Sequence, residues 1–137
     1  MRLLTRKIAT LGGAAALAAS GLVGVASPAS AATSCYAAGC TGKDPSTTVC
    51  QNDARTVASG WTEVELRYSP TCRAVWARKK NGSVGSEITV HNTDGDYNWV
   101  TVPAWSTGWT TMVNDAGITA QATETLHGGG FSTTAWY

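Results

Sequence analysis

The sequence predicts a small, disulfide-stapled all-β domain, either a sandwich or a barrel of about six to eight short strands. Short segments that alternate between apolar and polar residues recur along the chain, and turn-forming residues separate them. No amphipathic stretch long enough for an ordinary helix interrupts this pattern. Four cysteines lie in the first half of the expected domain, where cross-links would support a core of modest size.

The first 31 residues have the pattern of a secretory signal peptide. Three basic residues precede an uncharged apolar run over residues 8–25, and an Ala-Ser-Ala cleavage signal follows at residues 29–31. We therefore expect a secreted, extracellular protein of residues 32–137, folded as a single β-domain. After signal cleavage, no remaining segment is apolar enough to span a membrane.

The cysteines at positions 35, 40, 50 and 72 are predicted to form two disulfides, because cysteines of exported proteins are oxidised. Three pairings are possible. We favour Cys35–Cys40, which closes a small loop, and Cys50–Cys72, which ties the N-terminal segment to a central hairpin. The spacings lack the paired cysteine or histidine ligands of a zinc site, so we expect no metal.

The N-terminal part of the domain, residues 32–50, is predicted to be an irregular arm because it is rich in Gly, Ser, Thr and Ala. Within this arm, Asp44 suits the N-cap of a short helix and Pro45 suits its first position. Residues 50–54 fit one further helical turn. The arm is therefore expected to contain only short helical segments.

The expected centre of the fold is a hairpin over residues 66–78, preceded by a short strand at residues 56–59. The first hairpin strand alternates cleanly between apolar and charged residues, and proline presets the backbone of the turn at residues 69–71. The alternation predicts that four side chains of the hairpin point into the core, namely Leu66, Tyr68, Ala74 and Trp76.

The second half of the chain is expected to contain only strands and turns. The Asn81-Gly82 pair predicts a two-residue type I′ hairpin turn directly after the central hairpin. Alternating or β-branched segments then predict the later strands, at residues 86–91, 97–102, 109–113, 118–125 and 131–137.

Charge is distributed unevenly along the expected domain. Residues 32–80 carry seven basic and four acidic groups, whereas residues 81–137 carry five acidic groups and no Lys or Arg. The slightly acidic total argues against a nucleic-acid partner. A solvated surface explains this asymmetry, but a basic end can also steer the docking of a protein partner.

Motifs for catalysis are weak. His91 lies near Asp94 in sequence, but the chain has no G-x-S-x-G motif and no cysteine to spare as a nucleophile. Glu63 and Glu65 are roughly 7 Å apart on one strand face, a spacing compatible with inverting glycoside hydrolysis, yet they occupy outward polar positions. We therefore expect no enzymatic activity and no cofactor.

Six tryptophans are many for a domain of this size. Trp76 is predicted to lie in the core, and the strand positions of Trp99 and Trp109 suit the same role. Trp61 and Trp105 lie beside glycine or in a loop, where an exposed indole can anchor a protein partner or stack on a sugar ring. A small core built from all six is the alternative.

The order of several short motifs resembles that of the small secreted YjfA-type domain of actinobacteria, a domain of unknown function. The motifs are Cys-Tyr at 35–36, Thr-Gly-Lys-Asp-Pro at 41–45, Leu-Arg-Tyr-Ser at 66–69 and Cys-Arg-Ala-Val-Trp-Ala-Arg at 72–78. Members that follow a signal peptide alone resemble the adaptor subunit of Streptomyces umbrella toxin particles. The resemblance implies an antibacterial toxin complex in which this chain joins a large repeat-containing toxin subunit to lectin subunits.

The leading hypothesis from the sequence is thus a secreted, non-enzymatic adaptor that binds proteins. Two alternatives are kept, a secreted protease or amylase inhibitor and a carbohydrate-binding module that acts through Trp61 or Trp105. The inhibitor would need a rigid exposed loop, and either the turn at residues 69–72 or the loop at residues 104–108 could serve. The residues expected to bind a partner are Tyr36, Lys43, Arg67, Arg73, Arg78 and Trp105.

Overall fold

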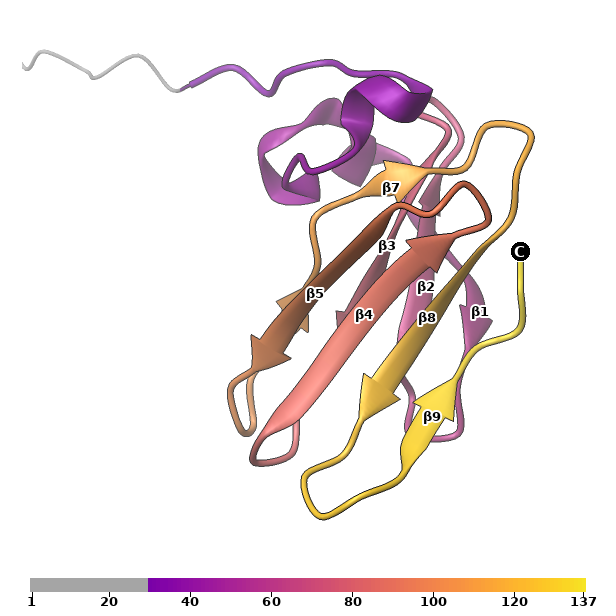
Figure 1. Cartoon of the computed structure of the whole chain (residues 1–137). Helices are drawn as coiled ribbons and strands as arrows, with labels where there is room; N and C mark the ends of the chain where they lie inside the picture. The colour runs from indigo at the N-terminus through magenta and orange to yellow at the C-terminus, as the bar shows by residue number, and fades with distance from the viewer. Residues whose placement is uncertain (1–29) are drawn as a thin grey trace, which may run out of the picture.

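The computed structural model describes residues 30–137, so nearly all of the predicted signal peptide lies outside the described residues. Nine short strands and three short 3-10 helices make up the described part, which confirms the predicted all-β class (Figure 1). None of the helices in residues 30–137 is long and apolar enough to cross a membrane.

The strands form two antiparallel sheets that pack face to face, so the fold is a sandwich (Figure 1). One sheet has the order β1-β2-β3-β6, with β7 also paired to β3, and the other has the order β5-β4-β8-β9. The strands of the first sheet are β1 Arg55–Ser59, β2 Glu65–Ser69, β3 Ala74–Lys79, β6 Gly108–Trp109 and β7 Val113–Asn114. Those of the second are β4 Ser86–Asn92, β5 Tyr97–Val102, β8 Ala120–Thr125 and β9 Phe131–Thr133.

The main hydrophobic core fills the space between the two sheets. Leu66 and Ala77 face each other across β2 and β3, and both are fully buried there. Ile88 and Val90 enter the same core from β4, since alternate residues of a strand share one face. Burial of such aliphatic side chains stabilises the fold by about 1.5–3 kcal/mol each.

A second core lies on the other side of β3, beneath the N-terminal arm. Trp76 and Ala74 point into it, together with Cys40, Cys50, Cys72 and Met112. The prediction that Trp76 and Ala74 share the core of Leu66 is therefore wrong. In the observed register Trp76 lies opposite Arg67, so it occupies the outer face of the first sheet and is buried only because the arm covers it.

The arm consists of three 3-10 helices, η1 Ala37–Cys40, η2 Pro45–Thr47 and η3 Val49–Asn52. Asp44 is the N-cap of η2 as predicted, because its carboxylate accepts a hydrogen bond from the Ser46 backbone N–H at 2.8 Å. Disulfides join Cys35 to Cys40 and Cys50 to Cys72, the pairing favoured from the sequence. The second disulfide ties η3 to the segment that precedes β3.

The Asn81-Gly82 segment is not a hairpin turn, so that prediction is wrong. The chain leaves the first sheet at the end of β3 and enters the second sheet at β4, and these two strands do not pair. Gly82 is required for a different reason, since a Cβ atom there would lie 2.5 Å from the Cγ1 atom of Val102. The strongest local turn signal therefore marks a crossing between the sheets.

The strand predicted at residues 109–113 is divided into β6 and β7, which pair with β3 at different points. Met112, between them, uses its backbone to bind the arm, because its N–H donates to the Lys43 carbonyl and its C=O accepts from the Gly42 N–H, both at 2.9 Å. The strand predicted at residues 131–137 is also shorter. Its last residues continue beside β8, where Tyr137 and Ala120 exchange backbone hydrogen bonds.

A charged pair lies inside the sandwich. Glu124 of β8 is fully buried, and one of its carboxylate oxygens lies 3.6 Å from the Nζ atom of Lys79 on β3. Lys79 also donates to the backbone carbonyl of Thr62, and Ser86 donates to the other carboxylate oxygen of Glu124. Burial of Glu124 removes an acidic group of residues 81–137 from the surface, and burial of Lys79 removes a basic group of residues 32–80 from it.

Candidate protein-docking cleft

A cleft of about 260 Å³ opens between the arm and the outer face of the first sheet. Two arginines on neighbouring strands, Arg67 and Arg78, line it together with Trp76 between them in sequence and Trp109 from β6. The other lining residues are Pro45, Ser46, Gln51, Ala54 and Thr107. The cleft therefore combines guanidinium groups with aromatic and small polar surfaces.

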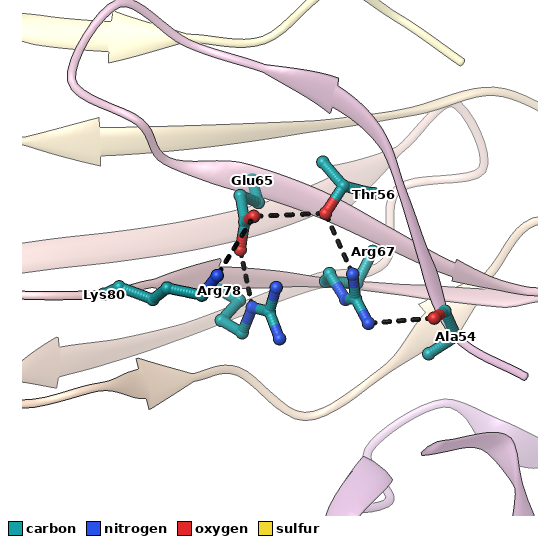
Figure 2. Close-up of polar contacts among 6 residues, drawn as sticks. All are labelled: Ala54, Thr56, Glu65, Arg67, Arg78 and Lys80. Carbon is teal, nitrogen blue, oxygen red and sulfur yellow. Dashed lines mark hydrogen bonds and ion pairs between the residues drawn. The ribbon is translucent and has the colours of Figure 1, made fainter. Parts of the chain in front are cut away.

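Strand register explains why the two arginines meet. Arg67 lies opposite Trp76, and Arg78 lies opposite Glu65, so all four side chains project from the same face of the β2–β3 hairpin. Figure 2 shows the Arg67 and Arg78 side chains next to each other on this face. Both were predicted as outward charges of the hairpin, and they are the two predicted partner-binding residues that line the cleft.

Glu65 holds Arg78 in place. One oxygen of Glu65 accepts from the Nε atom of Arg78 at 2.5 Å, and the other accepts from the Thr56 hydroxyl at 3.1 Å and lies 4.0 Å from the Lys80 Nζ atom (Figure 2). Burial alone would raise the pKa of Glu65, but these hydrogen bonds and positive charges outweigh it and lower the pKa. Glu65 is therefore a carboxylate whose two oxygens are both engaged.

Arg67 is held by β1 and by the residue that precedes this strand. Its two terminal amino groups donate to the Thr56 hydroxyl and to the Ala54 carbonyl, both at 2.9 Å (Figure 2). Its buried Nε–H has no hydrogen-bond partner among the described residues. Burial lowers the pKa of Arg67, and the positive charge of Arg78 lowers it further, against the attraction of Glu65. Arg67 remains protonated, because the pKa of a guanidinium starts far above neutrality.

The rim of the cleft is fixed by the arm. The indole Nε1–H of Trp109 donates to the Asp44 carboxylate at 3.0 Å, and the same oxygen accepts from Ser46. Partial burial would raise the pKa of Asp44, but the hydrogen bonds from Trp109 and Ser46 outweigh it and lower the pKa. One N-cap residue thus shapes η2 and orients Trp109 at the edge of the cleft.

A family model described as "Protein of unknown function (DUF2690)" matches residues 38–123, which include every residue that lines the cleft. The chain belongs to the DUF2690 family. No curated protein and no solved structure matches it. The matched range of the DUF2690 domain begins within η1 and ends within β8, so it excludes Cys35 and β9.

The other predicted partner-binding residues of the DUF2690 domain do not line the cleft. Arg73, at the end of the hairpin turn, has a left-handed backbone with φ of 49°. The hydroxyls of Tyr36 and Tyr68 lie close enough to raise the pKa of Arg73, so Tyr36 and Arg73 belong to one surface at the turn. Lys43 is exposed on the arm, and Trp105 is 84% exposed in a separate loop.

The exposure of two tryptophans was not predicted from the sequence. Trp109 was assigned to the core but is 39% exposed at the cleft, because β6 is too short to follow the alternation of a full strand. Trp99 was also assigned to the core, but it points outward from β5 beside Tyr97, and both are more than half exposed. The alternation of β5 could have predicted this, because Val100 and Val102 occupy the inward positions and Trp99 must then point outward.

Asp53 organises the hairpin turn from outside the hairpin. Its carboxylate accepts from the Ser69 hydroxyl at 2.6 Å and from the Thr71 backbone N–H at 2.8 Å. Desolvation would raise the pKa of Asp53, but these hydrogen bonds outweigh it and lower the pKa. The segment that leads from η3 into β1 therefore positions the turn that carries Arg73.

Asp115 gives the domain a predicted pH dependence. It is buried beside Arg73, its Oδ1 atom has no hydrogen-bond partner among the described residues, and burial raises its pKa to about 7 despite the attraction of Arg73. At pH values between 3.8, the pKa of Asp115 in the unfolded chain, and about 7, the folded protein binds one more proton at Asp115 than the unfolded chain does. We expect the free energy of unfolding, relative to that of Asp115→Asn, to fall as pH rises through this window and to level off above it.

Urea denaturation of the two proteins between about pH 5 and about pH 8 measures this difference. All other ionisable groups are the same in the two proteins, so the comparison isolates the contribution of Asp115. Parallel stability curves for the two proteins would contradict the raised pKa of Asp115.

Proposed function

We propose that this DUF2690 domain is a secreted, non-enzymatic adaptor that binds partner proteins, with its docking surface centred on the cleft of Arg67 and Arg78. The observation that carries the proposal is the cleft itself, because it presents two guanidinium groups and a partly exposed tryptophan on a rigid, cross-linked surface. Arginine and tryptophan are the residue types most enriched among the energetic centres of protein interfaces.

The resemblance to the YjfA-type domain supports a more specific form of this proposal. The chain would be the adaptor subunit of an antibacterial toxin particle of the Streptomyces umbrella type, placed between a large repeat-containing toxin subunit and lectin subunits. The cleft supplies one docking surface for such an adaptor. The surface at the hairpin turn, with Tyr36 and Arg73, lies apart from the cleft and is suited to a second partner.

Two disulfides in a small β-domain fit the extracellular setting that this role requires. No cysteine of the described chain is left free. The Cys50–Cys72 disulfide joins the arm covalently to the segment that precedes β3, next to the cleft. A docking surface held in this way loses little conformational entropy when a partner binds.

The decisive experiment recovers a tagged copy of the whole protein from the culture medium of its own organism and identifies the proteins that accompany it. We expect specific partners with the wild type, and at least about a tenfold loss of the partner that uses the cleft in an Arg67→Ser/Arg78→Ser variant. Arg55→Ser is the matched control, because Arg55 stacks over Tyr68, with 5.7 Å to the ring centroid, and does not line the cleft.

Thermal unfolding of each variant shows whether the fold is retained. Arg67→Lys/Arg78→Lys preserves the charge and replaces the serine variant if the latter does not fold. Recovery of the wild type only as a lone monomer would contradict the adaptor role. Unchanged partner recovery with the folded double variant would move the docking surface away from the cleft, and Arg73→Ser would then test the hairpin turn.

A further inference from the structure

The two arginines of the cleft have more hydrogen-bond donors than the protein uses. Arg78 donates through Nε to Glu65, and no residue among 30–137 accepts from its two terminal amino groups. Arg67 uses one N–H of each terminal amino group, and its Nε–H is buried without a partner in the described chain. A guanidinium has five N–H donors, and a buried donor without an acceptor is unfavourable. The two guanidinium groups therefore have N–H donors for which the described residues supply no acceptor.

The charge of the cleft identifies the kind of acceptor. The described residues that line it include two guanidinium groups and no carboxylate, and the Asp44 carboxylate at its rim already accepts hydrogen bonds from Trp109 and Ser46. Glu65 lies beside Arg78, but both of its oxygens already accept hydrogen bonds, from Arg78 and from Thr56 (Figure 2). Burial and the nearby positive charge of Arg78 both lower the pKa of Arg67, so the two cations repel each other. A bound anion would relieve this repulsion and supply the missing acceptors.

The size and walls of the cleft limit what carries the anion. A volume of about 260 Å³ accommodates one side chain and is below the range typical of pockets for larger ligands. Trp76, Trp109 and Pro45 give the cleft apolar surface next to the guanidinium groups. An acidic side chain matches this combination, because its methylene groups pack on apolar walls and its planar carboxylate fits the fork of an arginine.

We propose that the cleft binds the side-chain carboxylate of a Glu or Asp in an acidic segment of the partner protein, with Arg67 and Arg78 as its hydrogen-bond donors. This inference rests on the proposed docking function and names the chemical group that is recognised. Ser46 already donates its hydroxyl to Asp44, and Gln51 donates through Nε2 to the Ser46 carbonyl. The Oε1 atom of Gln51 at the same cleft is left to accept a backbone N–H of such a segment.

The test titrates the isotope-labelled protein with two blocked peptides, acetyl-Gly-Glu-Gly-amide and its Gln counterpart, and follows the arginine Nε–H and tryptophan indole signals by NMR. We expect saturable shifts of the Arg67, Arg78 and Trp109 signals with the Glu peptide only. Arg78→Lys keeps the charge but removes the fork, and it should weaken binding by about tenfold or more. Arg55→Lys, outside the cleft, should change the affinity by less than about twofold.

Absence of saturable shifts, or equal shifts with the Gln peptide, would overturn the proposal. Tighter binding of sodium phosphate than of the Glu peptide at equal ionic strength would also overturn it, since the site would then be selective for phosphate groups. If the peptide test fails while partner recovery still depends on Arg67 and Arg78, the docking function stands without a carboxylate ligand. If the peptide binds but no partner is recovered, the carboxylate site stands and the adaptor role fails.

Discussion

Replacing Lys79 with Met is expected to lower the free energy of unfolding by about 3–5 kcal/mol, one of the largest effects of any single substitution in this domain. Lys79 lies 3.6 Å from Glu124, which is fully buried in the core between the sheets. Without the ammonium group, the carboxylate remains in a medium of low polarity, and among residues 30–137 only the Ser86 hydroxyl donates to it. An uncompensated buried charge is far more costly than the pair.

A second variant separates the loss of a charge partner from the loss of packing. Lys79→Met/Glu124→Gln removes both charges and leaves an amide oxygen that still accepts from Ser86, so it should regain more than half of the lost stability. Lys80→Met is the matched control, because the neighbouring lysine side chain is 60% exposed and should contribute less than about 0.5 kcal/mol. Equal losses for Lys79→Met and Lys80→Met in urea denaturation would show that the buried pair has no special role.

Removal of the Cys50–Cys72 disulfide by a double alanine substitution is expected to lower the free energy of unfolding by about 3 kcal/mol, since it closes a loop with a sequence separation of 22. Removal of Cys35–Cys40, with a separation of 5, should lower it by only about 2 kcal/mol. Denaturation of both variants without reductant measures the two values. The reverse order of the two losses would contradict the loop-closure explanation.

The same comparison reports on the cleft. Cys50 and Cys72 connect η3 of the arm to the segment that precedes β3, and η3 and β3 both contribute residues to the cleft. The Cys50→Ala/Cys72→Ala variant should therefore bind partners more weakly than the Cys35→Ala/Cys40→Ala variant, even where both are folded. Partner recovery under conditions that keep both variants native distinguishes this effect from unfolding.

The alternation of apolar and polar residues correctly predicted the two strands of the central hairpin. It did not correctly predict on which face of the sheet each residue is buried. Leu66 and its neighbours alternate as a strand covered on one side, and the structure agrees. Residues 74–77 are instead four consecutive buried residues, the pattern of a strand covered on both faces. That run was visible in the sequence, but the arm that covers the outer face contacts it from more than twenty residues away.

The candidate site was predictable only in part for the same reason. Arg67 and Arg78 are outward residues of one hairpin, so their shared face follows from strand periodicity and register. Their meeting with Trp109 depends on how β6 joins the edge of β3, a pairing between distant parts of the chain. Asn81-Gly82 shows the opposite error, in which a strong local signal was overridden by a close approach between distant segments, with Gly82 against Val102.

The covalent link between the arm and the segment before β3 also bears on when the proposed docking surface becomes rigid. The core between the sheets contains none of the four cysteines, whereas the core beneath the arm contains Cys40, Cys50 and Cys72. In a newly synthesised chain with reduced thiols, we therefore expect the sandwich to form while non-covalent contacts alone hold the arm, among them its hydrogen bonds to Met112 and Trp109. Thiol oxidation should therefore strengthen partner binding at the proposed docking surface, so this surface would reach its final rigidity after the sandwich has folded.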